Sequence, residues 1–250
     1  MKNNIDPKVV SSFGEEWTAY DQSKMSSEET KNAFKDYFEI FPWDVLGSDA
    51  EGFDMGCGSG RWARFVAQRV SKLNCIEPSD AIETAKKNLS DIDNIHFIRG
   101  SITDPKILTG SQSFGYCLGV LHHIPDTQSG MKSCVELLKP GAPFLLYIYY
   151  NFENRSLSYK MIWQLSNLLR LFISKRSPSV KNLLTDIIAL FCYLPISRLS
   201  SLIEKLGFNA SFMPLYYYRK RSFFTLRTDS RDRFGTILEE RYSRKEIEKM

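Results

Sequence analysis

Residues 51–150 alternate short apolar segments with amphipathic ones, and this alternation restricts the fold more than any other feature of the chain. The apolar segments have the length of buried strands and cover residues 52–55, 73–77, 95–100, 114–120 and 144–150. The amphipathic segments have a helical period and cover residues 60–70, 79–89 and 129–138. Buried strands that alternate with helices are typical of a parallel sheet covered by helices on both faces. We therefore expect an α/β fold whose ligand binds at the carboxyl ends of the strands.

A glycine-rich turn follows the first strand, within the segment EGFDMGCGSGRW at 51–62. Gly56, Gly58 and Gly60 permit positive φ angles and let a ligand approach the main chain closely. Arg61 stands where a dinucleotide-binding turn has its third glycine. Asp54, two residues before the first glycine, would repel a pyrophosphate and attract a cationic amino group. The turn therefore favours a ligand with a cationic amino-acid end over one with phosphates.

Glu77 ends the second strand, 21 residues after Gly56. A carboxylate at this distance can accept hydrogen bonds from the hydroxyls of a ribose, as in dinucleotide-binding folds. NAD-binding proteins share this feature, so Glu77 indicates a nucleoside without identifying which one. A merely solvated glutamate is the alternative.

Three separated segments occur in the order typical of one known family. The segments DMGCGSG at 54–60, Glu77, and LGVLHH at 118–123 followed by LKPG at 138–141 resemble the motifs of the class I S-adenosylmethionine-dependent methyltransferases, in their small-molecule branch. The resemblance covers about residues 51–150. It implies a Rossmann-like, mostly parallel sheet, S-adenosylmethionine as the cofactor, and direct transfer of its methyl group to an acceptor.

The resemblance also implies which residues hold the cofactor. They are Asp54, Gly56, Cys57, Gly58, Gly60, Glu77, Pro78, Ser101, Ile102, Leu118 and Gly119. Ser101 stands where the family more often has an aspartate, and Ile102 is either a wall for the adenine or an ordinary core residue. Cys57 is interpreted as a small filler of the turn rather than a nucleophile.

His122 and His123 follow the fourth strand. A histidine there can take a proton from a substrate hydroxyl because its pKa is close to neutrality. We therefore name His123 as the candidate catalytic base; the alternative is that both histidines orient the loop or hold the cofactor. His96, on an apolar strand, is expected to be structural. The chain has no C-x-x-C pair, and we expect no metal site.

The second half of the chain differs from the first in charge and in pattern. Residues 1–150 hold 15 Lys/Arg and 20 Asp/Glu, a net charge of −5, whereas residues 151–250 hold 18 and 9, a net charge of +9. Helices are expected at 156–174 and 179–193, with apolar positions around most of their circumference, and a further helix is expected to end at Gly207. We expect a cap packed over the strand ends, its helices buried against each other; a membrane-surface helix is the alternative.

These patterns divide the chain into four parts. Residues 1–50 form an N-terminal helical segment over the cofactor site, with Trp17 or Tyr20 as candidate covers. Residues 51–150 form the cofactor-binding core, and residues 151–240 the helical, aromatic and basic cap. Residues 241–250 begin a core helix at the capping box Ser243–Glu246. The C-terminal strands that the family places after this helix are expected to be missing.

The expected function is methyl transfer to an oxygen or nitrogen of a small, possibly anionic, metabolite or sugar-containing acceptor. A non-catalytic relative that binds the cofactor or a partner is the main alternative, and an NAD-dependent oxidoreductase is the second. The loop after the fourth strand lacks the Pro-Pro-aromatic motif of enzymes that methylate base amines, which argues against nucleic acid as a partner.

A cytoplasmic location is expected from the chain's start and from its cysteines. The first ten residues lack an apolar signal core, and the longest apolar run, at 187–196, is too short to span a bilayer. The five cysteines are scattered and odd in number, which is typical of reduced thiols. We therefore expect no stable membrane insertion.

Overall fold

The computed structural model describes residues 4–20 and 25–250, which form two compact units. The first unit contains residues 4–20, 32–155 and 238–250, and the second contains residues 25–31 and 156–237. The last residues of the chain therefore belong to the same unit as the sheet.

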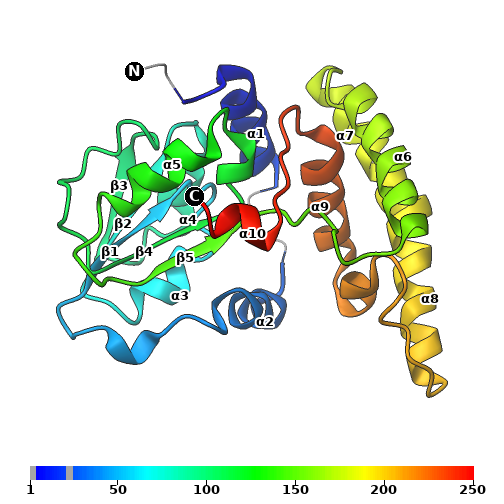
Figure 1. Ribbon diagram of the computed structural model, residues 1–250, viewed down its shortest axis with the longest axis horizontal. Coiled ribbons are helices and arrows are strands. Elements are labelled where there is room, and N and C mark those ends of the chain that lie inside the picture. The colour runs from blue at the N-terminus through cyan, green and yellow to red at the C-terminus, as the bar shows by residue number, and fades with distance from the viewer. Residues whose placement is uncertain (1–3, 21–24) are drawn as a thin grey trace. The chain divides into compact units, whose positions relative to one another are not determined.

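The first unit is built on a five-stranded parallel sheet (Figure 1). Its strands are β1 (Glu51–Met55), β2 (Lys72–Glu77), β3 (Ile95–Arg99), β4 (Phe114–Leu118) and β5 (Phe144–Tyr147). Their order is β3-β2-β1-β4-β5, so the order reverses beside β1, where open α/β sheets bind ligands. The α/β fold with a parallel sheet is confirmed, and in the described residues the sheet has five strands.

Six α-helices accompany this sheet along the chain. They are α1 (Pro7–Ala19), α2 (Ser27–Phe38), α3 (Ala63–Ala67), α4 (Ala81–Asn88), α5 (Thr127–Val135) and α10 (Arg244–Ile247). Helix α3 is shorter than the expected 60–70, because the turn after β1 continues as far as Trp62. Helix α1 lies within the helical segment that is expected over residues 1–50; Asp6 caps it by accepting a hydrogen bond from the Lys8 amide, and Pro7 occupies its first turn.

Two apolar clusters cover the two faces of the sheet. One is rich in aromatic side chains and joins Phe34 and Phe38 of α2 to Trp62 and Phe114. The other joins Phe53 and Met55 of β1 to residues of α5 and of the loop after β4. Successive residues of β1 point to opposite faces, so Asp54 points to the face opposite Phe53 and Met55.

Reciprocal glycine–phenylalanine pairs join β1 and β4. Gly52 is the register partner of Phe114, and Phe53 is the register partner of Gly115. A Cβ atom on Gly52 would lie 2.3 Å from the Phe114 ring, and one on Gly115 would lie 2.4 Å from the Phe53 ring. Each ring therefore lies directly on the backbone of the opposite strand, one on each face of the sheet.

The second unit is helical. It contains α6 (Leu157–Ile173), α7 (Pro178–Ile188), a π-helical turn (Ala189–Tyr193), α8 (Leu194–Lys205), a 3-10 turn (Tyr216–Lys220) and α9 (Phe223–Gly235). Helix α9 packs against α6 and α7, and Leu226 and Phe234 belong to its small apolar core. This helix was missed in the sequence because its buried face is largely polar and includes Thr225, Ser230 and Arg231.

The expectation that the apolar helices are buried against each other is wrong for most of their apolar residues. Leu157 of α6 is 79% exposed and Phe191 of the π-helical turn is 73% exposed. The helix expected at 179–193 and the further helix expected to end at Gly207 are not separate: residues Pro178–Lys205 form one continuous helix of 28 residues. A π-helical turn just before a proline relieves the clash and the lost hydrogen bond that proline causes in a regular helix.

The continuous helix Pro178–Lys205 is long and apolar enough to cross a membrane by length and composition alone. The apolar run at 187–196 is shorter than this helix because polar residues such as Asp186 and Ser197 bound it, whereas the helix continues past both. Such a helix is weak evidence for a membrane span, since helices of soluble proteins pass the same test.

The last residues of the chain return to the sheet of the first unit. The capping box is confirmed: the Ser243 hydroxyl accepts from the Glu246 amide, and the Glu246 carboxylate accepts from the Ser243 amide. Tyr242 forms an isolated parallel bridge with Tyr150, just after β5. We call residues 238–243 the C-terminal strap.

Replacing Gly115 with alanine should destabilise the first unit by overpacking. The added methyl group meets the Phe53 ring on an otherwise well-packed face, and such changes typically cost about 1–3 kcal/mol. Urea denaturation measures the change. Gly47→Ala is the matched control, because the added atom there meets only the end of the Asp49 side chain. A Gly115→Ala/Phe53→Leu double variant should recover part of the loss; additive losses would contradict the proposed contact.

Candidate functional site

The turn after β1 can be built only with glycines. Gly56, Gly58 and Gly60 have φ angles of +77°, +52° and +80°. A Cβ atom on Gly56 would lie 2.5 Å from Val120, and one on Gly60 would lie 2.5 Å from Leu89. The turn is therefore fixed by both backbone conformation and space.

Main-chain hydrogen bonds tie this turn to β2. The amides of Gly56 and Cys57 both donate to the Ile76 carbonyl, at 2.8 and 3.1 Å. The Gly58 amide donates to Oε2 of Glu77 at 3.1 Å. Three consecutive positions in the turn are thus anchored to the end of the neighbouring strand.

Asp54 is a buried acid at the start of this turn. Its side chain is 3% exposed, and within the described part of the chain Oδ2 has no hydrogen bond of normal geometry. Burial raises the pKa of the Asp54 carboxyl to about 8; the facing Tyr116 hydroxyl opposes the shift, and the charge of Glu77 adds to it. A cationic group beside Oδ2 would reverse this penalty, which fits the amino group of an amino-acid ligand.

Cys57 behaves as the small filler that the sequence predicts. It is buried, and hydrogen bonding to Cys75 together with burial raises the pKa of its thiol well above the usual value. A thiol held in its neutral form is a poor nucleophile. Cys57 therefore contributes packing to the turn.

Glu77 already has protein partners at both carboxylate oxygens. Oε2 accepts from the Gly58 amide, and Oε1 accepts from the Ser79 amide at 3.0 Å and from the Ser79 hydroxyl at 2.5 Å. Glu77 is 6% exposed, so it is not a merely solvated surface glutamate. Pro78 lies between the two partners in the chain. The sequence did not indicate this role in holding the glycine turn.

Ser101 and Ile102 follow β3 and lie in different surroundings. The Ser101 hydroxyl accepts from the Asp104 amide at 3.2 Å and stabilises a tight turn. Ile102 is 5% exposed, belongs to the core cluster around Phe53, and would lie 3.1 Å from a Cβ atom on Gly130 of α5. Its contact with an adenine therefore stays a prediction.

Leu118 and Gly119 end β4 at the same edge of the sheet. The Gly119 amide donates to the Tyr147 carbonyl at 3.2 Å, and Gly119 has a φ angle of +82°. A Cβ atom on Gly119 would meet nothing within 4 Å. The backbone here borders open space, unlike the crowded backbone at Gly56.

His123 is oriented by the C-terminal strap. Its Nδ1 lies 2.6 Å from the Leu238 carbonyl oxygen, which can only accept a hydrogen bond. Nδ1 therefore carries the proton of the neutral ring, and Nε2 carries the lone pair. This is the tautomer that a base acting through Nε2 requires.

His122 lies beside His123 but is fully buried. Its ring stacks on Tyr149 with centroids 3.8 Å apart, and burial, together with the charges of His123 and Arg241, lowers its pKa well below the usual range. The strap also covers it, since the Glu240 amide donates to the His122 carbonyl. His122 is therefore a neutral packing partner of this loop. The strap residues were missed because they lie more than 110 positions away in the sequence.

Helix α1 covers the ends of three strands. A Cβ atom on Gly58 would lie 3.2 Å from the Trp17 ring, and one on Gly14 would lie 3.0 Å from Ser79. Phe13 contacts the His123 ring, with centroids 5.0 Å apart. The start of the helix is held by Asn4, whose amide donates to the Asp126 carbonyl at 2.7 Å and accepts from its amide at 2.8 Å.

The predicted site residues thus lie at or just after the carboxyl ends of β1 to β4, at one edge of the sheet. Among the residues that the structure describes, no group of three His, Cys, Asp or Glu side chains is placed to hold a metal ion. This edge carries the buried carboxyls of Asp54 and Glu77, the glycine turn at 56–60, the open backbone at Gly119 and the buried ring of His123. A buried carboxyl such as Asp54 suits an organic ligand with a cationic end.

Comparisons with known proteins find similarity over part of the chain. Residues 53–141 match a family described as a methyltransferase domain. A ubiquinone biosynthesis O-methyltransferase of Nitrosospira multiformis is 28% identical over 118 residues, which cover 45% of this chain and 46% of that protein. The protein of the same name from Coxiella burnetii is 31% identical over 104 residues, 40% of this chain and 44% of that protein. The chain thus spans less than half the length of these curated relatives.

Solved structures with a similar arrangement include two further proteins. The YcgJ protein of Bacillus subtilis aligns with a TM-score of 0.46 at 17% identity, over 58% of this chain and 59% of that chain. A methyltransferase dependent on S-adenosylmethionine from Mesorhizobium loti aligns with a TM-score of 0.38 at 20% identity, over 42% of this chain and 51% of that chain.

Replacing Asp54 with asparagine should stabilise the ligand-free protein above neutral pH. The raised pKa means that the folded protein holds this proton more tightly than the unfolded chain does. The contribution of Asp54 to stability is thus present below about pH 4 and is lost as the pH rises through about 8. The asparagine side chain does not ionise, so the variant should gain stability relative to wild type between these values, by up to about 1.4 kcal/mol per pH unit.

Urea denaturation at several pH values measures this difference. Asp93→Asn, at an exposed position of the same unit, is the matched control and should track wild type. A wild-type profile parallel to that of Asp54→Asn would show that the carboxyl is ionised throughout.

Proposed function

We propose that this chain, whose residues 53–141 match a methyltransferase domain, is a class I S-adenosylmethionine-dependent methyltransferase that transfers a methyl group from S-adenosylmethionine to an oxygen of a small molecule. The observation that carries the proposal is Asp54: a buried acid whose Oδ2 lacks a partner of normal geometry in the described structure, at the start of a turn of positive-φ glycines. The cofactor supplies a methyl group already activated by its sulfonium.

In this proposal the chain's residues bind the two ends of the cofactor differently. Asp54 takes the ammonium group, and the main chain of the turn around Gly58 takes the rest of the methionine end. Glu77 contacts the ribose with the lone pairs left over from its bonds to Gly58 and Ser79, since a carboxylate can accept about four hydrogen bonds. Pro78, Ser101 and Ile102 border the adenine in the same proposal.

In the same proposal the acceptor binds on the side of the site that bears His123. Leu118 and Gly119 separate it from the cofactor, and His123 removes the proton of the acceptor hydroxyl. The hydrogen bond from Nδ1 to Leu238 supports this role because it leaves Nε2 as the basic nitrogen. The protonated ring then keeps both of its N–H groups, one of them still bound to the strap.

The acceptor atom is proposed from the relatives. Both relatives described above are named for O-methylation in ubiquinone biosynthesis, which favours a hydroxyl over an amine. A small acceptor with an anionic group suits the excess of basic residues in 151–250. We also propose a location in the cytoplasm, because all five cysteines are free thiols and free thiols are typical of a reducing compartment.

Calorimetry should show that S-adenosylmethionine and S-adenosylhomocysteine bind and that NAD does not. An ammonium group beside Asp54 lowers the carboxyl pKa from about 8, so binding near pH 7 should release up to one proton. The observed enthalpy should therefore depend on the ionisation enthalpy of the buffer. In Asp54→Asn both the affinity and this dependence should be lost. Preferential binding of NAD would refute the proposal.

Replacing His123 with glutamine should lower kcat about 10²–10⁴-fold while the affinity for S-adenosylmethionine stays unchanged. Release of S-adenosylhomocysteine in the presence of a panel of hydroxylated small molecules measures turnover. His96→Gln is the matched control, because His96 lies exposed on β3. If the cofactor binds but no member of the panel, hydroxylated or amine-bearing, accepts a methyl group, the non-catalytic alternative is favoured.

A further inference from the structure

We propose that the second unit docks on an anionic membrane surface through the outward faces of α6 and of the continuous helix Pro178–Lys205, without crossing the bilayer. The inference does not depend on the methyl acceptor. It rests on a polar inner face, two apolar outer stripes, and an excess of positive charge within the same unit.

The inner face of α7 is committed to protein contacts. Asp186 forms an ion pair with Arg227 of α9, with atoms 2.5 and 2.8 Å apart. Next to it, Ser230 donates to the Thr185 carbonyl at 2.9 Å, and Arg231 donates to Asn182 at 2.8 Å. A helix that binds polar partners along one side cannot be surrounded by lipid, so it can lie on a bilayer but not span one.

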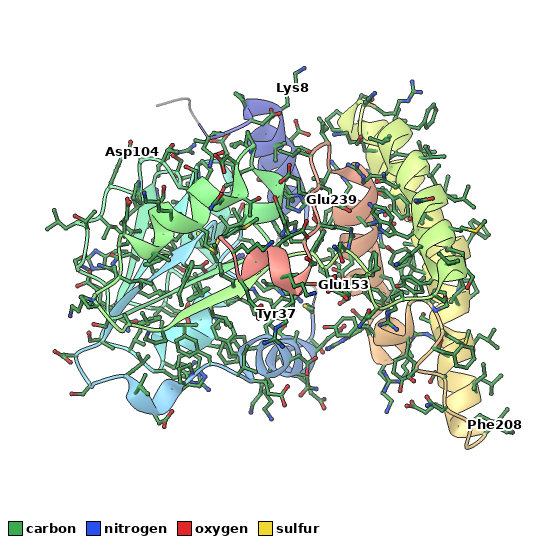
Figure 2. The ribbon with its side chains drawn as sticks, viewed as in Figure 1. Lys8, Tyr37, Asp104, Glu153, Phe208 and Glu239 are labelled. Carbon is green, nitrogen blue, oxygen red and sulfur yellow. The ribbon has the colours of Figure 1, made fainter. Side chains whose placement is uncertain are left out.

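The outer face of the same helix is an apolar stripe. Its residues form two groups with spacings of three or four positions, as one side of a helix requires: Val180, Leu183, Ile187 and Leu190 or Phe191, and then, eight positions after Phe191, Leu199, Leu202 and Leu206. Each is between 41% and 73% exposed. The stripe continues into the turn after α8, where Phe208 is 68% exposed and points away from the helix (Figure 2).

Helix α6 has a second stripe of the same kind. Its members are Leu157, Met161, Leu165, Leu168 and Phe172, at spacings of three and four residues, and each is at least 54% exposed. Isolated exposed apolar residues are ordinary on soluble proteins, but repeated stripes of large ones mark an interaction surface.

The excess of positive charge in this unit indicates that the partner of the apolar stripes is anionic. Residues 156–237 carry 13 Lys/Arg and four Asp/Glu. Lys175 and Arg176 follow α6 and Lys205 ends α8; all three are exposed and form no ion pair with any other described residue. The Arg176 guanidinium lies 3.9 Å over the exposed Phe172 ring, which places a cation beside an apolar anchor.

An anionic lipid surface offers partners for both parts of this face. Apolar side chains enter the boundary between headgroups and acyl chains, while lysine and arginine contact the headgroups. A second copy of the chain would instead bring together two units that each carry a strong excess of positive charge, which opposes association.

Binding of the full chain to vesicles tests the proposal directly. Sedimentation with vesicles of phosphatidylcholine and phosphatidylglycerol should be strong, and sedimentation with phosphatidylcholine alone should be weak. Cys192, the one exposed cysteine of the five, provides a reporter on the proposed surface. An environment-sensitive fluorophore on Cys192 should shift its emission to shorter wavelength when the anionic vesicles are added, and Cys192→Ser is the labelling control.

Substitutions separate the apolar and the charged contributions. Leu165→Asp with Leu168→Asp should weaken vesicle binding by at least tenfold, because the apolar side chains that would be buried in the bilayer are removed. The matched control is Ile40→Asp with Leu108→Asp, because both are 81% exposed in the first unit. Lys175→Gln with Arg176→Gln should weaken binding about 25-fold, at roughly fivefold per charge, whereas Lys87→Gln should have little effect. Circular dichroism confirms that each variant is folded.

Three results would overturn the proposal. The first is failure of the wild-type chain to bind the anionic vesicles. The second is equal binding by wild type and the leucine variant. The third is a dimer, seen by light scattering, that the leucine substitutions dissociate while no variant binds vesicles, since this would assign the apolar stripes to a second copy. None of these results bears on cofactor binding, which Asp54→Asn tests separately.

Discussion

The hydrogen bonds between the glycine turn and the end of β2 are the constraint on which the site depends. They hold three successive amides, at Gly56, Cys57 and Gly58, on the Ile76 carbonyl and the Glu77 carboxylate. Because β1 and β2 are paired in parallel register, these bonds also fix where Asp54 points relative to Glu77. A shift of β2 by one residue would remove the Glu77 carboxylate from the turn and reverse the faces of its apolar residues.

The buried carboxyl of Asp54 lowers the stability of the folded chain. Its carboxyl is buried with little polar compensation, and ionising it in the free protein is unfavourable, as its raised pKa records. Nearby cysteines and Tyr116 fill space around it without supplying a cation. Local instability of this kind is typical of sites whose missing partner is a ligand. The rest of the unit offsets the cost through two well-packed aromatic and aliphatic clusters.

The sequence predicted the first unit better than the second for a physical reason. Apolar strands such as Phe114–Leu118 and the glycine spacing after β1 are local signals, and both the parallel sheet and the turn follow from them. The strap contacts of His123 join residues far apart in the chain, so no local pattern contains them. Helix α9 buries threonine, serine and arginine, and it therefore lacks the apolar period by which a helix is found. The hydrogen bond between Glu77 and the Gly58 amide could not be predicted from the sequence, because it depends on the register of β1 and β2, which no local pattern specifies.

Helix α1 contacts two separate parts of the candidate site. Its Trp17 ring lies against the glycine turn and its Phe13 ring lies against His123. Just before the helix, the Asn4 side chain forms two hydrogen bonds with the backbone of Asp126. One helix thus contacts both the glycine turn and the loop that carries His123. A shift of this helix would therefore change the surroundings of the glycine turn and of the His123 ring together.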